Sequence, residues 1–201
     1  MEENEKSGLG AFFQNNMDAI SKLFVYHIAM CIFGLVVSIA LEMLATQIRG
    51  TDSEWLSVAT WIGGVFAMLI YLGLTYVCMW EKGASDKIKI DGGRQKKNIG
   101  KGVLIWLIAS SINIFSLLNI AVLSFISSAA NTHGLITLAG LYYNAMYYPI
   151  LWLFSKFEIT ALYLIVLIPG ALVSFLSYLS GVSGQKCIFP EPKGERNRRI
   201  R

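Results

Sequence analysis

The sequence has few charged residues, few cysteines and only two histidines. Charged residues make up 15% of its 201 residues, whereas a soluble domain usually carries about 25%. The three cysteines (Cys31, Cys78 and Cys187) are an odd number with no CxxC pair, and His27 lies far along the chain from His133. This composition predicts neither a disulfide framework nor a metal site.

The sequence also lacks the common catalytic signatures. It contains no HExxH, no GxSxG and no glycine-rich loop ending in Gly-Lys-Ser/Thr, which mark zinc peptidases, serine hydrolases and phosphate-binding loops. The DGGR stretch at 91–94 resembles the start of the alcohol phosphotransferase motif of phospholipid synthesis. No aspartate follows it before the C-terminal tail to complete the metal-binding set. We therefore predict that the protein is not an enzyme and has no catalytic residue and no cofactor.

What the chain has instead is long apolar stretches. Hydrophobic residues account for 55% of the sequence. Each of four stretches is long enough for a helix across a hydrocarbon core of about 30 Å. They lie near residues 23–46, 55–80, 103–128 and 159–180. The predicted fold class is an all-α integral membrane domain, residues 23–180, whose four transmembrane helices pack as a bundle.

The lysines and arginines are distributed unevenly around these stretches. Fifteen of the 17 lie before the first stretch, between the second and third, or after the fourth, and only Arg49 and Lys156 fall on the other side. Basic residues collect on the cytoplasmic side of a membrane. We therefore predict a multi-pass protein of the cytoplasmic membrane with both termini cytoplasmic, and residues 181–201 as its basic tail.

The basic segments flank the spans, so we expect them to contact the anionic headgroups of the inner leaflet or a partner protein. The expected contact residues are Arg94, Lys96, Lys97, Arg198 and Arg199. Nucleic acid is not expected as a partner, because the aromatic side chains that stack on bases lie at the opposite membrane face. A different membrane protein and a second copy of this chain both stay open as partners.

Two segments outside the four stretches have a pattern of their own. Residues 9–22 place apolar side chains at helical spacing opposite polar ones, which predicts an amphipathic helix on the inner surface, within a cytoplasmic segment 1–22. Residues 129–158 are rich in tyrosine, tryptophan and phenylalanine, and we expect an aromatic segment at the outer surface. The alternative is a fifth span at 135–154, which would place the basic tail outside.

Each predicted span carries a stripe of small or polar residues spaced three or four apart. Gly34, Gly64 and Gly170 belong to these stripes and are expected where helix backbones approach closely. The same stripes would line a polar path if the protein moves a solute, and spacing alone leaves both interpretations open. Pro169, directly before Gly170, predicts a kink or a freed carbonyl in the fourth span.

Four polar residues within the spans are candidates for function. Glu42 is the foremost, because a carboxylate within a span is costly and indicates function by default. An ion pair with Arg49 near the outer end of the span is its competing explanation. The others are His27, Asn113 and Asn119, for which hydrogen bonding at an interface or between helices is the alternative role.

One segment carries a family resemblance. Residues 79–102 contain a Trp-x-x-Gly-x-x-Asp stretch at 80–86, a Gly-Arg pair and a Lys-Gly pair before the third span. This arrangement resembles small multi-span membrane proteins of Gram-positive, clostridia-type bacteria. The resemblance covers the first half of the chain best and implies a bacterial cytoplasmic membrane. No activity is assigned to that family, so no catalytic residue carries over.

Three functions compete. The first is a non-enzymatic accessory or partner-binding component of the bacterial cytoplasmic membrane, with residues 81–102 and the arginine-rich tail as docking elements. The second is a small-solute transporter or channel that uses the polar stripes. A lipid-modifying enzyme is the least supported, since the carboxylates and histidines do not converge. A water-filled cavity at Glu42 and Asn113 would favour transport, and a dry bundle would favour the first function.

Overall fold

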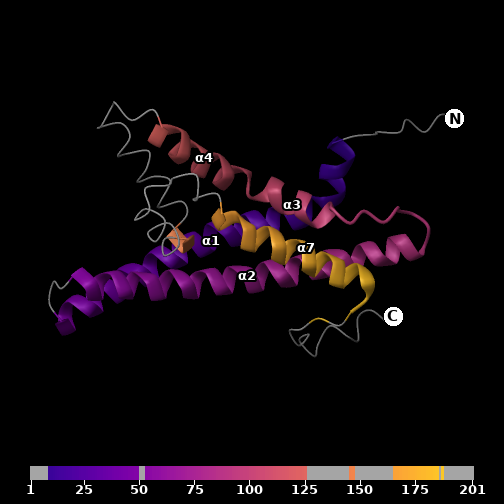
Figure 1. The fold of residues 1–201 in the computed structure, drawn as a ribbon. Helices are drawn as coiled ribbons and strands as arrows, with labels where there is room; N and C mark the ends of the chain where they lie inside the picture. Colours follow the sequence, from indigo (N-terminus) through magenta and orange to yellow (C-terminus); the bar gives the residue numbers. More distant parts are fainter. Residues whose placement is uncertain (1–8, 50–52, 126–144, 148–164, 186, 188–201) are drawn as a thin grey trace.

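The computed structural model describes residues 9–49, 53–125, 145–147, 165–185 and 187. Within these residues all regular structure is helical (Figure 1). The helices are α1 (Leu9–Arg49), α2 (Ser53–Asp91), α3 (Lys101–Ala109), α4 (Ser111–Phe125), the 3-10 turn η1 (Ala145–Tyr147) and α7 (Leu167–Ser183).

Two of these helices are long and apolar enough to cross a membrane, over Gly10–Ile48 and Trp61–Asp91. The pair α3–α4 makes a third candidate span if its two parts, bent by 62°, act as one. The protein is thus all-helical in its described part, with two to three candidate spans. The first part of the predicted fourth span, most of the aromatic segment and most of the basic tail lie outside the described residues. Of the aromatic segment, Ala145–Tyr147 is described, and Met146 and Tyr147 are buried there.

The predicted amphipathic helix over 9–22 is not a separate element. It forms the first turns of α1, which continues without a break to Arg49. No glycine or proline interrupts the chain from Ala11 to Phe33, so nothing in this stretch ends the helix. Ala19, Ile20 and Leu23 are buried in a cluster that includes residues of α2, α3 and α7. This segment therefore packs against the other helices with the face that was expected to lie on the membrane surface.

Helix α2 continues about three turns past Trp80, where the second span was predicted to end. The first half of the predicted solvated loop 81–102 is therefore helical. The helix ends at Asp91 and is closed by Gly93, whose φ of 71° lies in the left-handed region. The amides of Gly93 and Arg94 donate to the carbonyls of Ile90 and Lys89 at 3.0 and 2.9 Å, which is the Schellman arrangement that closes many helices.

The predicted third span is broken into α3 and α4. The break falls at the pair Ser110–Ser111, a kind of site at which helices bend. Pro169 lies in the first turn of α7, where its missing N–H has no helical acceptor to lose. Residues 148–164, on the far side of the kink predicted there, lie outside the described residues.

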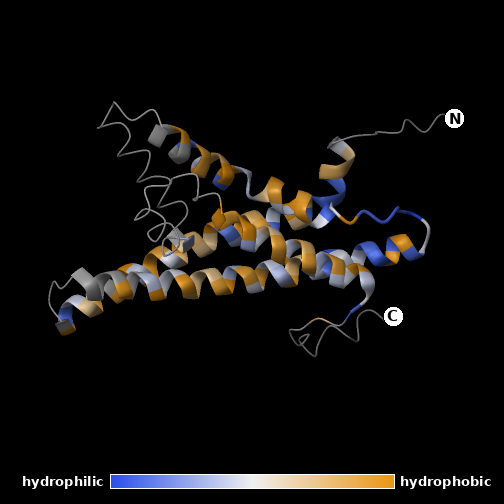
Figure 2. Ribbon diagram, in the orientation of Figure 1, coloured by the Kyte–Doolittle hydropathy of each residue, from blue (hydrophilic) through white to orange (hydrophobic). Residues whose placement is uncertain are grey.

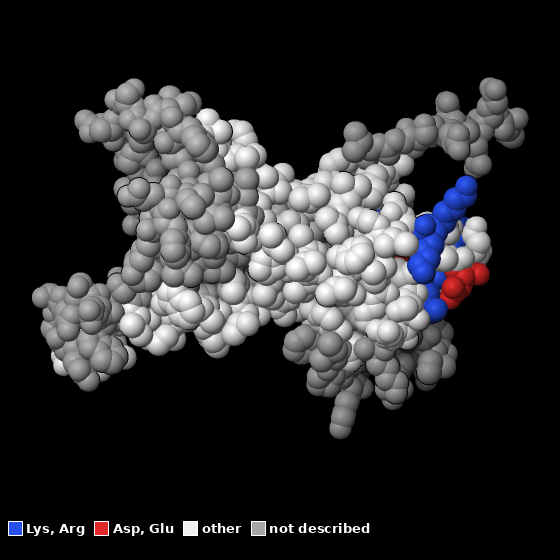
Figure 3. All heavy atoms as spheres, in the orientation of Figure 1, with Lys and Arg blue, Asp and Glu red and all other residues white. Residues whose placement is uncertain are grey.

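The arrangement separates an apolar body from a charged end. Helices α1 and α2 run antiparallel, and α7 lies along the second half of α2 with α3 beside it (Figure 1). Figure 2 shows apolar residues along most of the helices and polar ones at the end of α2 and in the segment that follows. On the face drawn in Figure 3 the charged side chains gather at that same end. Large apolar side chains are exposed along the body, for example Ile32, Leu69 and Phe115, as contact with lipid requires.

Glycines bring the helices of the charged end close together. A Cβ at Gly181 of α7 would press on the carbonyl of Trp80 and lie 2.8 Å from the amide nitrogen of Ala84. A Cβ at Gly83 of α2 would press on the carbonyl of Tyr178 and lie 3.0 Å from the amide nitrogen of Val182. The backbones of α2 and α7 are therefore in direct contact, which only glycine at both positions allows.

We predict that Gly83→Ala and Gly181→Ala each lower the free energy of unfolding in detergent by about 1–3 kcal/mol, because the added methyl group forces two backbones apart. The control is Gly10→Ala in α1, where no atom lies within 4 Å of the added Cβ. Its stability should equal or exceed that of the wild type, because alanine favours helix. Equal melting temperatures for all three variants would contradict the close α2–α7 packing.

Candidate functional site

The charged end is organised around a buried carboxylate. Asp86 lies on the extended part of α2 and its side chain is fully buried. Lys82 contacts one carboxylate oxygen, Oδ1, at 2.9 Å. The other oxygen, Oδ2, accepts from Lys101 Nζ at 2.6 Å and from the Tyr178 hydroxyl at 3.0 Å. Three donors from three helices thus meet on one carboxylate.

The three donors account for the burial of the charge. A buried ion pair is stable only when its members are fully paired and hydrogen bonded, because removing charges from water costs several kcal/mol per ion. The side chain of Lys101 is 6% exposed and that of Lys82 12% exposed. With two ammonium groups beside it, Asp86 is held in its ionised form. The cluster of Asp86, Lys82 and Lys101 then carries one positive charge in excess.

The cluster also includes α1. Besides its contact with Asp86, the Lys82 ammonium donates to the backbone carbonyl of Asn15 at 3.1 Å. Asn15 lies in the first turns of α1, in the part that was predicted to be a separate surface helix. One group of hydrogen bonds therefore connects α1, α2, α3 and α7.

Glycines at fixed positions allow these side chains to meet. Gly102 follows Lys101, and a Cβ there would lie 2.6 Å from Tyr178 Cβ and 2.9 Å from the Ser174 carbonyl oxygen. Gly83 gives α2 the same close approach to α7. Trp80 adds a bond from its indole Nε1 to the carbonyl of Gln185 at 3.0 Å. The residues of the Trp-x-x-Gly-x-x-Asp and Lys-Gly stretches thus come together in space.

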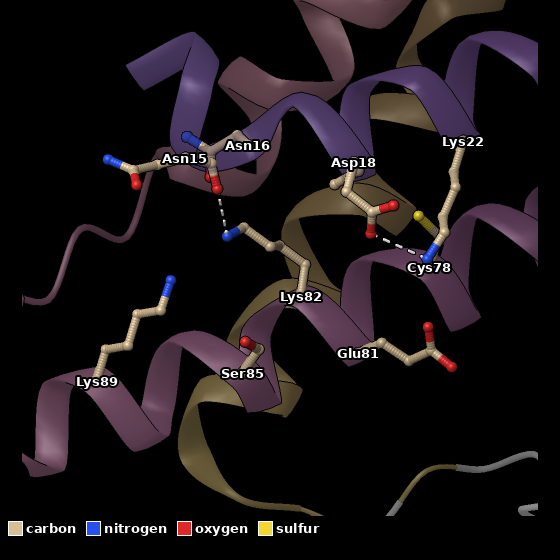
Figure 4. A pocket seen from close by; sticks show the side chains of 10 residues that line it. Asn15, Asn16, Asp18, Lys22, Cys78, Glu81, Lys82, Ser85 and Lys89 are labelled. Atoms are coloured by element: carbon tan, nitrogen blue, oxygen red, sulfur yellow. Dashed lines mark hydrogen bonds and ion pairs between the residues drawn. The ribbon is translucent and has the colours of Figure 1, made fainter. Parts of the chain in front are cut away.

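Two open pockets flank the cluster. The first, of about 340 Å³, lies between the first turns of α1 and the end of α2. Figure 4 shows its polar walls, with Asp18 paired to Lys22 at 3.0 Å on one side and Ser85 and Lys89 on the other. The second pocket, of about 580 Å³, lies between the start of α1 and the segment that joins α2 to α3. Both open at the charged end of the molecule.

The polar residues predicted within the spans lie elsewhere. His27 is buried in the body, with its ring 5.4 Å from that of Tyr71 in an edge-to-face contact and 6.0 Å from that of Tyr147. Asn113 is buried, and Asn119 donates its amide to the carbonyl of Phe115 at 2.8 Å within α4. Glu42 belongs to α1, but its side chain lies outside the described residues, and so does that of Arg49. The structure does not bring His27, Asn113 or Asn119 into the Asp86 cluster.

The predicted packing glycines are all buried. A Cβ at Gly34 would lie 3.2 Å from Ala67 Cβ and 3.2 Å from Met146 Cα, and one at Gly170 would lie 2.6 Å from the indole of Trp106. Gly64 is buried on α2. Of the predicted headgroup or partner contacts, Arg94, Lys96 and Lys97 are exposed at the charged end. Arg198 and Arg199 lie outside the described residues.

Sequence reasoning did not single out Asp86, Lys82, Lys101 or Tyr178 as site residues. A Lys and an Asp in a stretch dense in charge are typical of a solvated loop. A signal was present, however. Gly83 and Asp86 lie three residues apart, a spacing that also occurs within the predicted stripes, but the stripe predicted on the second span ends before Trp80. Among the described residues, no three His, Cys, Asp or Glu side chains form a group that could hold a metal ion.

Comparison of the chain with protein-family models, with curated proteins and with solved structures finds no match.

We predict that Asp86→Asn lowers the free energy of unfolding by about 3–5 kcal/mol, because it leaves two buried ammonium groups without their counter-charge. The matched control is Asp91→Asn, one turn further along α2. Asp91 pairs with Lys87 at the same i,i+4 spacing, but at 3.5 Å and with its side chain 64% exposed. Loss of an exposed pair costs about 0–1 kcal/mol. Denaturation of both variants in detergent checks the difference, and similar losses would contradict a structural role for the buried cluster.

Proposed function

We propose that this chain is a non-enzymatic, multi-pass integral membrane protein of the bacterial cytoplasmic membrane. It acts as an accessory component that binds a partner at its charged end. In this proposal four helices span the membrane as a bundle and both termini are cytoplasmic. The support for this orientation is the collection of basic residues on one side of the spans.

The observation that carries the proposal is the way the charged end is built. Hydrogen bonds connect four helices there, and those of Lys101 and Tyr178 to Asp86 are buried, so the surface around them is held in one arrangement. A polar groove opens on that surface between α1 and α2, with both acidic and basic side chains in its walls. A preorganised polar surface lowers the entropic cost of binding a partner.

The state of Asp86 also supports a role in binding rather than in catalysis. Its two carboxylate oxygens already accept from three donors of the same chain. A general base must reach a proton on its substrate, and a fully buried carboxylate with these bonds has no such access. In the described part of the chain, the strongest ionic cluster is therefore structural.

A transporter or channel is the second candidate, and one observation favours it. The side-chain oxygens of Asn113 in α4 and Ser174 in α7 are buried and have no hydrogen-bond partner among the described residues. Buried polar atoms of this kind are normally satisfied by water or by a ligand. A solute path through the bundle would need buried polar atoms of this kind.

A steric block in the groove tests the first candidate. We predict that tagged wild-type protein, purified from native membranes, carries a partner in a fixed ratio, and that Ser85→Trp reduces the recovered partner about tenfold by filling the groove. The control is Ser183→Trp, which places the same bulk at an exposed position on α7. It should leave recovery unchanged.

Recovery of the partner at the wild-type level with Ser85→Trp would contradict docking in the groove. So would a wild-type protein that carries no partner and, alone in liposomes, mediates a solute flux that Asn113→Leu abolishes.

A further inference from the structure

The second pocket of the charged end is strongly basic. Its walls come from the first turns of α1, the end of α2 and the segment that joins α2 to α3. Four cationic side chains line it, Lys89, Arg94, Lys96 and Lys101, and none of its lining residues is acidic. This separates it from the groove of Figure 4, whose walls include Asp18 and Glu81.

Three of these cations have no acidic partner among the described residues. Among the described residues, the ion pairs within 4.0 Å of a basic group join Lys22 to Asp18, Lys87 to Asp91, and both Lys82 and Lys101 to Asp86. Lys89, Arg94 and Lys96 take part in none of them. Like charges gathered in one pocket repel each other. Binding of an anion there would therefore lower the electrostatic free energy of the protein.

The buried cluster strengthens the positive charge of this pocket. Lys101 is both a lining residue and a member of the cluster, which has two ammonium groups for one carboxylate. Its Nζ lies 2.6 Å from Asp86, which holds this ammonium group at the pocket wall. The pocket thus combines one fixed cation at its base with cations on exposed side chains around it.

We propose that this pocket binds a phosphate group, either of an anionic lipid headgroup or of a small soluble phosphate ester. A phosphate carries the compact negative charge that several cations can share, and the Arg94 guanidinium can bind two of its oxygens at once. The pocket volume of about 580 Å³ lies in the range of small-molecule sites. The polar amides of Asn15 and Asn98 in its wall suit the remaining oxygens of a headgroup or ester.

The inference rests on the proposed function and deepens it, because it names the chemistry that the charged end recognises. A pocket at the charged end of an apolar helical body lies at the level of lipid headgroups when the body is in a bilayer. Anionic lipids attract such clusters of lysine and arginine. All four cations lie within residues 89–101, and the segment that joins α2 to α3 provides two of them, Arg94 and Lys96.

Binding of full-length protein to phosphatidylglycerol in nanodiscs, compared with phosphatidylcholine, tests the proposal, with soluble glycerol 3-phosphate as a second probe. The pocket variant is the double substitution Arg94→Gln and Lys96→Gln. The control is the double substitution Lys22→Gln and Lys87→Gln, which removes the same charge from the same end of the molecule at residues that do not line the pocket. We expect the pocket variant to bind about tenfold more weakly and the control to stay within about twofold of wild type.

The two probes identify the source of the phosphate. Binding of phosphatidylglycerol alone supports a lipid headgroup, and binding of glycerol 3-phosphate with similar strength supports a soluble ester. Equal weakening of both double variants would overturn the pocket, since it would show attraction by surface charge in general. Absence of binding to both probes would also overturn it. The two proposals can fail independently of each other. Ser85, which is substituted to test the partner groove, does not line the phosphate pocket.

Discussion

The arrangement of this protein depends on the carboxylate of Asp86. It is the one described acidic side chain that is fully buried, and it is the acceptor on which α2, α3 and α7 converge. The same cluster reaches α1 through the second bond of Lys82. Each buried charge is stable only while its hydrogen-bond partners are in place. A shift of any one helix would therefore weaken the bonds that hold the other helices in the cluster. This makes the charged end a single cooperative unit.

The proposed setting in a membrane would explain why such a unit is needed. Helices in lipid gain little from burying apolar side chains, because lipid tails are as apolar as leucine. Association then depends on close backbone packing and on hydrogen bonds between helices. Both are present here at one place. Gly83, Gly102 and Gly181 remove the bulk that would separate the backbones, and Asp86 supplies the hydrogen bonds across the resulting contact. The apolar body presents leucine, isoleucine and phenylalanine outward instead.

The sequence alone predicts the class of fold but not the organisation of the charged end. Long apolar stretches indicate helices and membrane spans directly, and the described part of the chain is helical with two to three candidate spans. The length of α1 and the bend at Ser110 were not predicted, because local propensity is similar on either side of each predicted boundary.

The buried ion cluster was missed for a physical reason. In a single sequence, a lysine and an aspartate four residues apart look the same whether they face water or three other helices. Asp91 and Lys87 show the exposed case on the same helix. Burial of Asp86 is decided by Lys101 and Tyr178, which are 15 and 92 residues away along the chain. Gly83, three residues before Asp86, is the local signal that distinguishes the two pairs, because Asp91 has no glycine at that spacing.

Amide hydrogen exchange of the Asp86→Asn variant tests the central claim most directly. If Asp86 holds the four helices together, exchange should accelerate jointly at the end of α2, in α3, in the second half of α7 and in the first turns of α1, since local opening follows the loss of a shared interaction. The apolar half of α1 and α2 should keep its protection. Faster exchange confined to residues 81–91 would contradict the claim, because it would show that Asp86 stabilises only its own helix.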